Sequence, residues 1–200
     1  MIAAIQSFFA SIAVSFDLPI LEWIQAHLQS GFFDVFMPFI TKFGDGGVFW
    51  IAVSVIMLFF PKTRKWGWSV LTALLLGLVI CNMILKPTIA RVRPYDLYEE
   101  LYGKAYPLLV KALHDGSFPS GHTIACFEAC TALTIRNKKV GIPAIILAVL
   151  VACSRLYLFV HYPTDVLFSV FAGTLFGFLG CVIVDAVYKK IPEKKGKYQK

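Results

Sequence analysis

Long runs of hydrophobic residues fill most of the chain and are separated by short polar segments. Runs of about 17–25 apolar residues are typical of helices that cross a bilayer. No internal repeat, low-complexity tract or interdomain linker divides the sequence, so residues 1–200 are interpreted as a single domain. The pattern predicts an all-α, polytopic membrane helix bundle with about six transmembrane helices, at approximately residues 20–44, 48–60, 66–88, 121–136, 141–160 and 164–188.

The first predicted span has two interpretations. Its apolar run is interrupted by Glu22, His27 and Asp34, yet the apolar residues near its start recur at helical spacing with polar residues off that stripe. Residues 1–28 therefore either enter the first crossing or form an N-terminal interfacial helix that lies on the membrane. The sequence Gly-Asp-Gly-Gly at 44–47 predicts a tight turn before the second span.

The composition excludes an ordinary water-soluble domain, because 58% of the residues are hydrophobic and only 16% are charged. The net charge is +7, but the basic residues flank apolar runs and are interpreted as orientation signals, so no nucleic-acid partner is expected. The five cysteines lie in apolar stretches without the spacing of a metal site. They predict buried thiols rather than a disulfide framework or a zinc site.

Basic residues in the connections predict the orientation in the membrane. By the positive-inside rule, the cytoplasmic side holds three basic clusters and both termini, since an even number of crossings is predicted. The long connection at about 89–120 and the corner at 161–165 then face the extracytoplasmic side of a multi-pass, bacterial cell membrane protein. The basic clusters are Lys62, Arg64 and Lys65; Arg136, Lys138 and Lys139; and Lys189, Lys190, Lys194, Lys195, Lys197 and Lys200.

The first polar cluster on the predicted outer side runs from Lys86 to Pro94. Lys86 is a compact cation, and the planar guanidinium of Arg93 suits two oxygens of one phosphate group. The alternative is that both side chains extend to lipid headgroups, as basic residues near helix ends commonly do.

The second polar cluster is Phe118-Pro119-Ser120-Gly121-His122, directly before a predicted span. A helix that begins here directs free N–H groups and its positive dipole end outward, and Gly121 allows close approach to the backbone. His122 is then placed to transfer a proton beside a bound anion. The alternative is a helix cap with an interfacial histidine.

The third polar cluster runs from Ser154 to Asp165 and contains Arg155 and His161. Arg155 lies near the end of an apolar span, where an unpaired charge is unfavourable. Asp165 follows His161 by four residues, so its carboxylate is expected to accept a hydrogen bond from one imidazole nitrogen and leave the other free to attack. A purely structural histidine–aspartate pair is the alternative.

The spacing of these clusters is that of a known family. KX6RP from Lys86 to Pro94, PSGH from Pro119 to His122 and SRX5HX3D from Ser154 to Asp165 resemble the type 2 phosphatidic acid phosphatase superfamily. The motifs cover about a dozen specific positions and follow the family's order. The predicted six-span frame resembles the integral membrane branch of this superfamily rather than its larger, soluble haloperoxidases.

The resemblance implies an enzyme, a lipid phosphatase that acts without a metal or other cofactor. It implies that His161 is the nucleophile that forms a phosphohistidine, that His122 is the general acid and base, and that Asp165 supports His161. The phosphate-binding residues would be Lys86, Arg93, Ser120, Gly121 and Arg155.

The substrate is not determined by these motifs, because they recognise the phosphate and not the lipid. An outward-facing site favours undecaprenyl diphosphate, the spent lipid carrier of cell-wall synthesis, with phosphatidylglycerol phosphate or phosphatidic acid as alternatives. A lipid-phosphate binding or transport protein, or a phosphotransferase with an acceptor other than water, would also use the cationic site. A binder, however, has no need of both His161 and Asp165.

Three features lie outside the motifs. Glu128 and Asn82 lie in predicted spans, where hydrogen bonding to a neighbouring helix is expected. The acidic and aromatic loop at 95–117 is interpreted either as a lid at headgroup level or as a plain connection. The sequence does not determine the oligomeric state.

Overall fold

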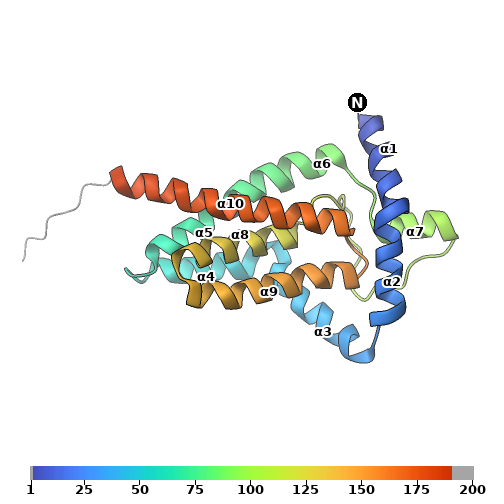
Figure 1. Cartoon of the computed structure of the whole chain (residues 1–200), viewed down its shortest axis with the longest axis horizontal. Coiled ribbons are helices and arrows are strands. Elements are labelled where there is room, and N and C mark those ends of the chain that lie inside the picture. Colours follow the sequence, from blue (N-terminus) through green and yellow to red (C-terminus); the bar gives the residue numbers. More distant parts are fainter. Residues whose placement is uncertain (1, 191–200) are drawn as a thin grey trace, which may run out of the picture.

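The computed structural model describes residues 2–190, and this part of the chain is helical, without strands (Figure 1). The all-helical class predicted from the sequence is confirmed, and several helices are long and apolar enough to cross a membrane. The basic residues at 194–200 lie outside the described part of the chain.

The N-terminal helix lies across one end of the bundle. α1 (Ile2–Ile12), the π-helical turn η1 (Ala13–Asp17) and α2 (Leu18–Leu28) form one continuous helix that runs crosswise to the other helices in Figure 1. Its stretch Gln6–Leu28 is long and apolar enough to span a membrane. Its position across the end of the bundle favours the interfacial alternative. The single span predicted at 20–44 is wrong, because one helix ends at Leu28 and the next begins at Gly31.

The chain leaves this helix because Gln29 is extended, with a ψ of 129°, and Ser30 caps a new helix. The Ser30 hydroxyl accepts a hydrogen bond from the Phe33 N–H at 3.4 Å, which satisfies one of the free donors at a helix start. This helix is α3 (Gly31–Thr41), and the sequence analysis did not identify its beginning.

One kinked segment replaces two predicted crossings. α3 continues through the 3₁₀ segment η2 (Lys42–Gly47) into α4 (Val48–Leu58). Within η2, Asp45 is extended, and Gly46 and Gly47 have φ values of 54° and 68°, a conformation that glycine adopts most easily. The predicted turn at 44–47 therefore redirects the chain without reversing it.

The remaining helices form the bundle around α8. α5 (Arg64–Gly77) continues through the π-helical η3 (Leu78–Leu85) into α6 (Lys86–Ile89), and α8 (Gly121–Arg136), α9 (Lys138–Tyr157) and α10 (Pro163–Lys190) follow. α8 packs against α5, α9 and α10. A Cβ atom at Gly177 of α10 would lie 2.7 Å from the Glu128 carbonyl oxygen, so glycine permits this close approach.

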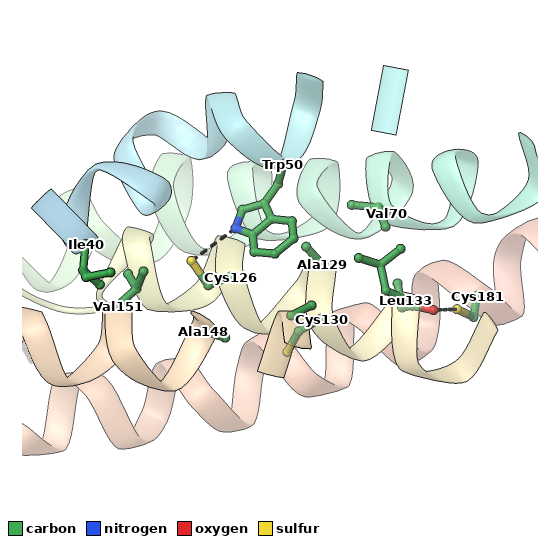
Figure 2. Packing of buried hydrophobic residues seen from close by; sticks show 12 residues of the cluster. Ile40, Trp50, Val70, Cys126, Ala129, Cys130, Leu133, Ala148, Val151 and Cys181 are labelled. Carbon is green, nitrogen blue, oxygen red and sulfur yellow. Dashed lines mark hydrogen bonds between the residues drawn. The ribbon is translucent and has the colours of Figure 1, made fainter. Parts of the chain in front are cut away.

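The buried core around α8 also includes residues of α4 and α9. Figure 2 shows Trp50 of α4 against α8, where its indole N–H donates to the sulfur of Cys126 at 3.2 Å. Ala148 and Val151 of α9 are fully buried in the same cluster. The cysteine side chain therefore packs as a small apolar group and also accepts the indole hydrogen bond.

The two ends of the bundle differ in charge. At one end, Asp185 of α10 pairs with Lys65 at 2.7 Å and with Arg136 at 2.8 Å, so the basic clusters gather there as the sequence predicted. The N-terminal helix lies at the opposite end (Figure 1). The first described helix and the end of α10 therefore lie at opposite ends of the bundle, because two predicted crossings are one segment. The membrane side of each terminus stays a prediction.

The connection between the first two motifs is more ordered than a plain loop. It begins with α7 (Pro94–Tyr102) and continues over the N-terminal helix. Tyr102 donates to Glu22 at 2.9 Å, Tyr106 donates to Gln25 at 2.8 Å, and the Tyr106 ring stacks on Phe159 at 4.1 Å. These contacts attach the connection to both α2 and the corner before α10.

Candidate active site

Lys86 and Arg93, the two cations of the first motif, converge on a third residue. The Asp115 carboxylate accepts from Lys86 Nζ at 2.8 Å and from Arg93 Nη2 at 2.7 Å. Arg93 is 2% exposed and also donates to the Val160 carbonyl at 2.7 Å, next to His161. Burial opposes the ionisation of Asp115, but the hydrogen bonds and charges of the two cations outweigh it and lower its pKa to about 2.

His161 lies in the corner between α9 and α10, and its tautomer is fixed by a backbone group. Its Nδ1 is 2.7 Å from the Ser117 carbonyl oxygen, which only accepts, so Nδ1 carries the proton and Nε2 is free. Burial lowers the pKa of His161 well below its usual value, and the charges of Arg155 and Arg93 act in the same direction. The imidazole is therefore neutral at pH 7.

Asp165 does not make the hydrogen bond that the sequence analysis predicted. It lies 3.7 Å from Nδ1 of His161, beyond hydrogen-bonding distance, and the Ser117 carbonyl takes its place. Its carboxylate accepts from the Arg91 guanidinium and, at 3.0 Å, from the Tyr162 N–H. Asp165 thus acts on His161 through charge at close range.

Arg91 and Asp17 are buried site residues that the sequence analysis missed. Arg91 is 4% exposed, donates to both Asp165 and Asp17, and places its guanidinium carbon 3.9 Å from the Tyr162 ring centre. Asp17 also accepts from Thr164, which ties the N-terminal helix to the start of α10. The sequence signal that could have identified Asp17 is the presence of a carboxylate within an apolar run, because a charge there requires a partner.

His122 begins α8 and pairs with a carboxylate from a distant segment. Its Nε2 lies 2.7 Å from Oδ1 of Asp45, which belongs to η2. The predicted helix start at Ser120 is present, and His122 occupies the first turn. The sequence identified His122 as a site residue but did not identify Asp45 as its partner. The only feature of Asp45 in the sequence is its place in a glycine-rich turn.

Arg155 and Ser120 support the site from behind. Arg155 is 3% exposed and donates to Thr41 at 2.6 Å, while its Nε atom has no partner among the described residues. Ser120 is fully buried, and its hydroxyl lies 3.0 Å from that of Thr123. In this arrangement the Ser120 hydroxyl does not face the cavity, contrary to its predicted contact with phosphate.

A cavity of about 790 Å³ joins most of the predicted site. Its polar part is lined by Lys86, Arg93, Gly121, His122 and His161. Its apolar part extends along α4, α5 and the start of η3, where it is lined by Ile51, Leu71, Leu74, Leu75 and Leu78. The cavity therefore offers a cationic end for an anion and a hydrophobic end for a hydrocarbon chain.

Glu128 and Asn82 also line this cavity. Glu128 is 1% exposed, lies against Gly77 of α5, and its Oε1 has no partner among the described residues. The hydrogen bond to a neighbouring helix that the sequence analysis expected is therefore not made by this oxygen. Asn82 approaches Gly121, where an added Cβ would lie 3.0 Å from the amide oxygen.

The fold and this site define an integral membrane phosphatase that acts on phosphorylated lipids. A sequence model described as the PAP2 superfamily matches residues 66–189, and the chain belongs to this superfamily. The predicted resemblance is therefore confirmed. Within residues 6–190, no group of three or more histidine, cysteine or acidic side chains is arranged to hold a metal ion.

Characterised proteins resemble the chain over most of its length. It is 35% identical over 148 residues to an undecaprenyl-diphosphatase of Sulfolobus acidocaldarius, which covers 74% of this chain and 68% of that protein. The crystal structure of Aquifex aeolicus LpxE superposes with a TM-score of 0.72 at 26% identity, over 83% of this chain and 94% of that one. A phosphatidylglycerolphosphate phosphatase from Bacillus subtilis superposes with a TM-score of 0.64 at 27% identity, over 97% and 98% of the two chains.

Proposed function

We propose that the protein hydrolyses the phosphomonoester or diphosphate of a membrane lipid through a phosphohistidine intermediate, with undecaprenyl diphosphate as the favoured substrate. The observation that carries this proposal is the position of the His161 imidazole, neutral and with Nε2 free, in a cavity that is cationic at one end and apolar at the other. A phosphorylated lipid has the same division between an anionic head and a hydrocarbon tail.

In the first half of the reaction, the lone pair of His161 Nε2 forms a bond to phosphorus while the bond from phosphorus to the leaving oxygen breaks. The imidazole ring becomes positively charged. The Ser117 carbonyl at 2.7 Å and the Asp165 carboxylate at 3.7 Å from Nδ1 stabilise this charge. Arg91 holds Asp165 in place from the other side.

His122 transfers the protons in both halves of the reaction. It gives a proton to the leaving oxygen as the lipid departs. In the second half it accepts a proton from water while the water oxygen attacks phosphorus, the bond to His161 breaks, and inorganic phosphate is released.

The cations of the first and third motifs stabilise the charge on the other phosphate oxygens. Lys86 and Arg93 reach the cavity, but both are bonded to Asp115 in the structure. A bound phosphate would replace this carboxylate on one or both cations. Arg155 lies outside the described lining of the cavity and has no partner for its Nε–H among the described residues, so it would add positive charge from behind the two cations.

The relatives support a phosphorylated lipid as the substrate. The Sulfolobus relative is named for undecaprenyl diphosphate, and the Bacillus structure is named for phosphatidylglycerol phosphate. In this chain, leucines of α5 form the apolar end of the cavity, which would receive the first carbons of either lipid. The sequence favoured the diphosphate because the site was predicted to face outward.

The proposed topology places the site on the extracytoplasmic face. The basic residues around Lys65 and Arg136 lie at the end of the bundle opposite the motifs, and the positive-inside rule assigns that end to the cytoplasm. The C-terminal end of α10 is then cytoplasmic, and the N-terminal helix lies at the outer surface. Cysteine labelling at Ser7 or Lys104 from outside intact cells tests this assignment, which fails if only permeabilised cells are labelled.

The proposed function is tested by phosphate release from a panel of lipids. The purified protein in detergent is given undecaprenyl diphosphate, phosphatidylglycerol phosphate and phosphatidic acid, with His161→Ala as the control. We expect release from at least one lipid, fastest from the diphosphate, and none by the variant. Binding without release would indicate a lipid-phosphate binding protein, and transfer of phosphate to an added alcohol at the expense of release would indicate a phosphotransferase.

A further inference from the structure

We propose that Asp45 is a positioning residue for His122 that holds its imidazole for proton transfer and stabilises the protonated ring. This inference rests on the proposed phosphatase function. Asp45 lies outside residues 66–189, which the PAP2 superfamily model matches, so the family motifs do not include it. Its carboxylate is 2.7 Å from Nε2 of His122 although the two residues are 77 positions apart.

The segment that carries Asp45 is shaped around the histidine ring. A Cβ atom at Gly44 would lie 2.9 Å from both Cβ and Cδ2 of His122 and 3.0 Å from Val151, so any larger residue there would displace the ring. Gly46 and Gly47 have positive φ values and turn the chain immediately after Asp45. Three glycines therefore permit the one carboxylate to reach Nε2.

This contact assigns different tasks to the two ring nitrogens. Cδ2 and Nε2 are neighbouring ring atoms, and both face η2, one against Gly44 and the other against Asp45. Nδ1 lies on the opposite edge of the ring, and His122 lines the cavity. In this arrangement Nε2–H donates to Asp45, while Nδ1 gives its proton to the leaving oxygen and later takes one from water. Asp45 remains ionised throughout.

The charges around His122 make such a partner necessary. Burial disfavours the protonated form of the ring most, and the positive charges of Arg155 from α9 and Lys86 from α6 act in the same direction. His161 from the corner before α10 is a third neighbour. The Asp45 carboxylate opposes the two cations. Without it, an imidazole between these cations would carry a proton over a narrower range of pH.

A competing interpretation is that Asp45 occupies the position of a substrate oxygen and hinders binding. The two roles predict opposite results for Asp45→Asn, which keeps the shape of the side chain and removes its charge. For the positioning role, we expect kcat to fall about 10–100-fold with little change in KM, as for a weakened general acid. The alkaline limb of the pH–rate profile should move to lower pH.

A second measurement, inhibition by inorganic phosphate, separates the two roles independently of kcat. If Asp45 positions His122, inhibition by inorganic phosphate should be nearly unchanged in Asp45→Asn. If Asp45 competes with the anion, phosphate should inhibit the variant more strongly and KM should fall, and either result would overturn the proposal. Asp96→Asn is the matched control, because it removes one exposed carboxylate from α7 and should leave kcat, KM, the pH–rate profile and inhibition by phosphate unchanged.

Gly44→Ala tests the same contact from the backbone, since its added methyl group would press on the His122 ring. We expect it to lower kcat as Asp45→Asn does, and near-normal kcat in both variants would refute the positioning role. Failure of the wild-type protein to release phosphate would instead refute the phosphatase function. A thermal melt of each purified variant shows whether it is folded, and substitution of Asp45 by Glu should recover part of kcat.

Discussion

Replacement of Arg91 by alanine should destabilise the protein severely, because it leaves two buried carboxylates without their shared partner. Arg91 pairs with Asp17 and Asp165, and the side chains of these three residues are 0–3% exposed. Removing one partner of a buried ion pair costs about 3–5 kcal/mol, since the remaining charge stays out of water. For a chain of this size, about 2–4 °C of Tm corresponds to 1 kcal/mol, so Tm should fall by roughly 6–20 °C.

The assay is thermal unfolding of the purified protein in one detergent, followed by the fluorescence of its tryptophans. Lys104→Ala is the control, because it removes an exposed cation from the connection after α7. The double variant Asp17→Ala/Arg91→Ala should lose less stability than the sum of the single variants, since one of the unpaired carboxylates is gone. If the Tm of Arg91→Ala lay within about 2 °C of the wild-type value, which corresponds to roughly 1 kcal/mol or less, this account of the buried ion pairs would be refuted.

Three further outcomes are expected. Gly177→Ala should lower the melting temperature, because its methyl group would lie 2.7 Å from the Glu128 carbonyl oxygen. Gly31→Ala, with no atom within 4 Å of the added Cβ, should leave the melting temperature unchanged, and equal melting temperatures of the two variants would contradict the close packing of α8 and α10. The pKa of Asp115 is lowered to about 2, so its ion pairs with Lys86 and Arg93 stabilise the fold above the ordinary carboxyl pKa and are lost as the pH falls from about 4 towards 2. Hydrogen exchange in residues 103–117 should therefore rise over that range, and constant protection would count against these ion pairs. Activity should persist in excess EDTA and be inhibited by vanadate, which mimics five-coordinate phosphorus; a requirement for added magnesium would refute the role given to the fixed cations.

Much of the helical frame followed from hydropathy alone. The spans predicted at 66–88, 121–136, 141–160 and 164–188 correspond to α5 with η3 and α6, and to α8, α9 and α10. Three of these are long apolar runs, whereas α8 is shorter and less apolar and was identified by the helix start at Ser120. An apolar helix satisfies its own backbone hydrogen bonds wherever it lies. The error at 20–60 arose because hydropathy does not report direction: it cannot distinguish a helix along the bundle from one across its end.

The positions of the charged motif residues were also accessible from the sequence, since a cation or histidine beside an apolar span requires a reason to be there. Lys86, Arg93, His122 and His161 do line one cavity, as predicted. Ser120 was assigned to phosphate on the resemblance, but its hydroxyl lies against Thr123. A motif specifies residue types and spacing, whereas the direction of a small side chain depends on its neighbours.

The partners of these residues were decided by tertiary structure. Ser117 rather than Asp165 fixes the His161 tautomer, Arg91 joins Asp165 to Asp17, and Asp45 reaches His122 across 77 positions. Sequence by itself determined which chemistry the chain carries, through residue types near the ends of apolar runs. Only the folded bundle decided which carboxylate meets which cation or imidazole, because such pairs depend on distances of a few ångströms between segments that no local pattern relates.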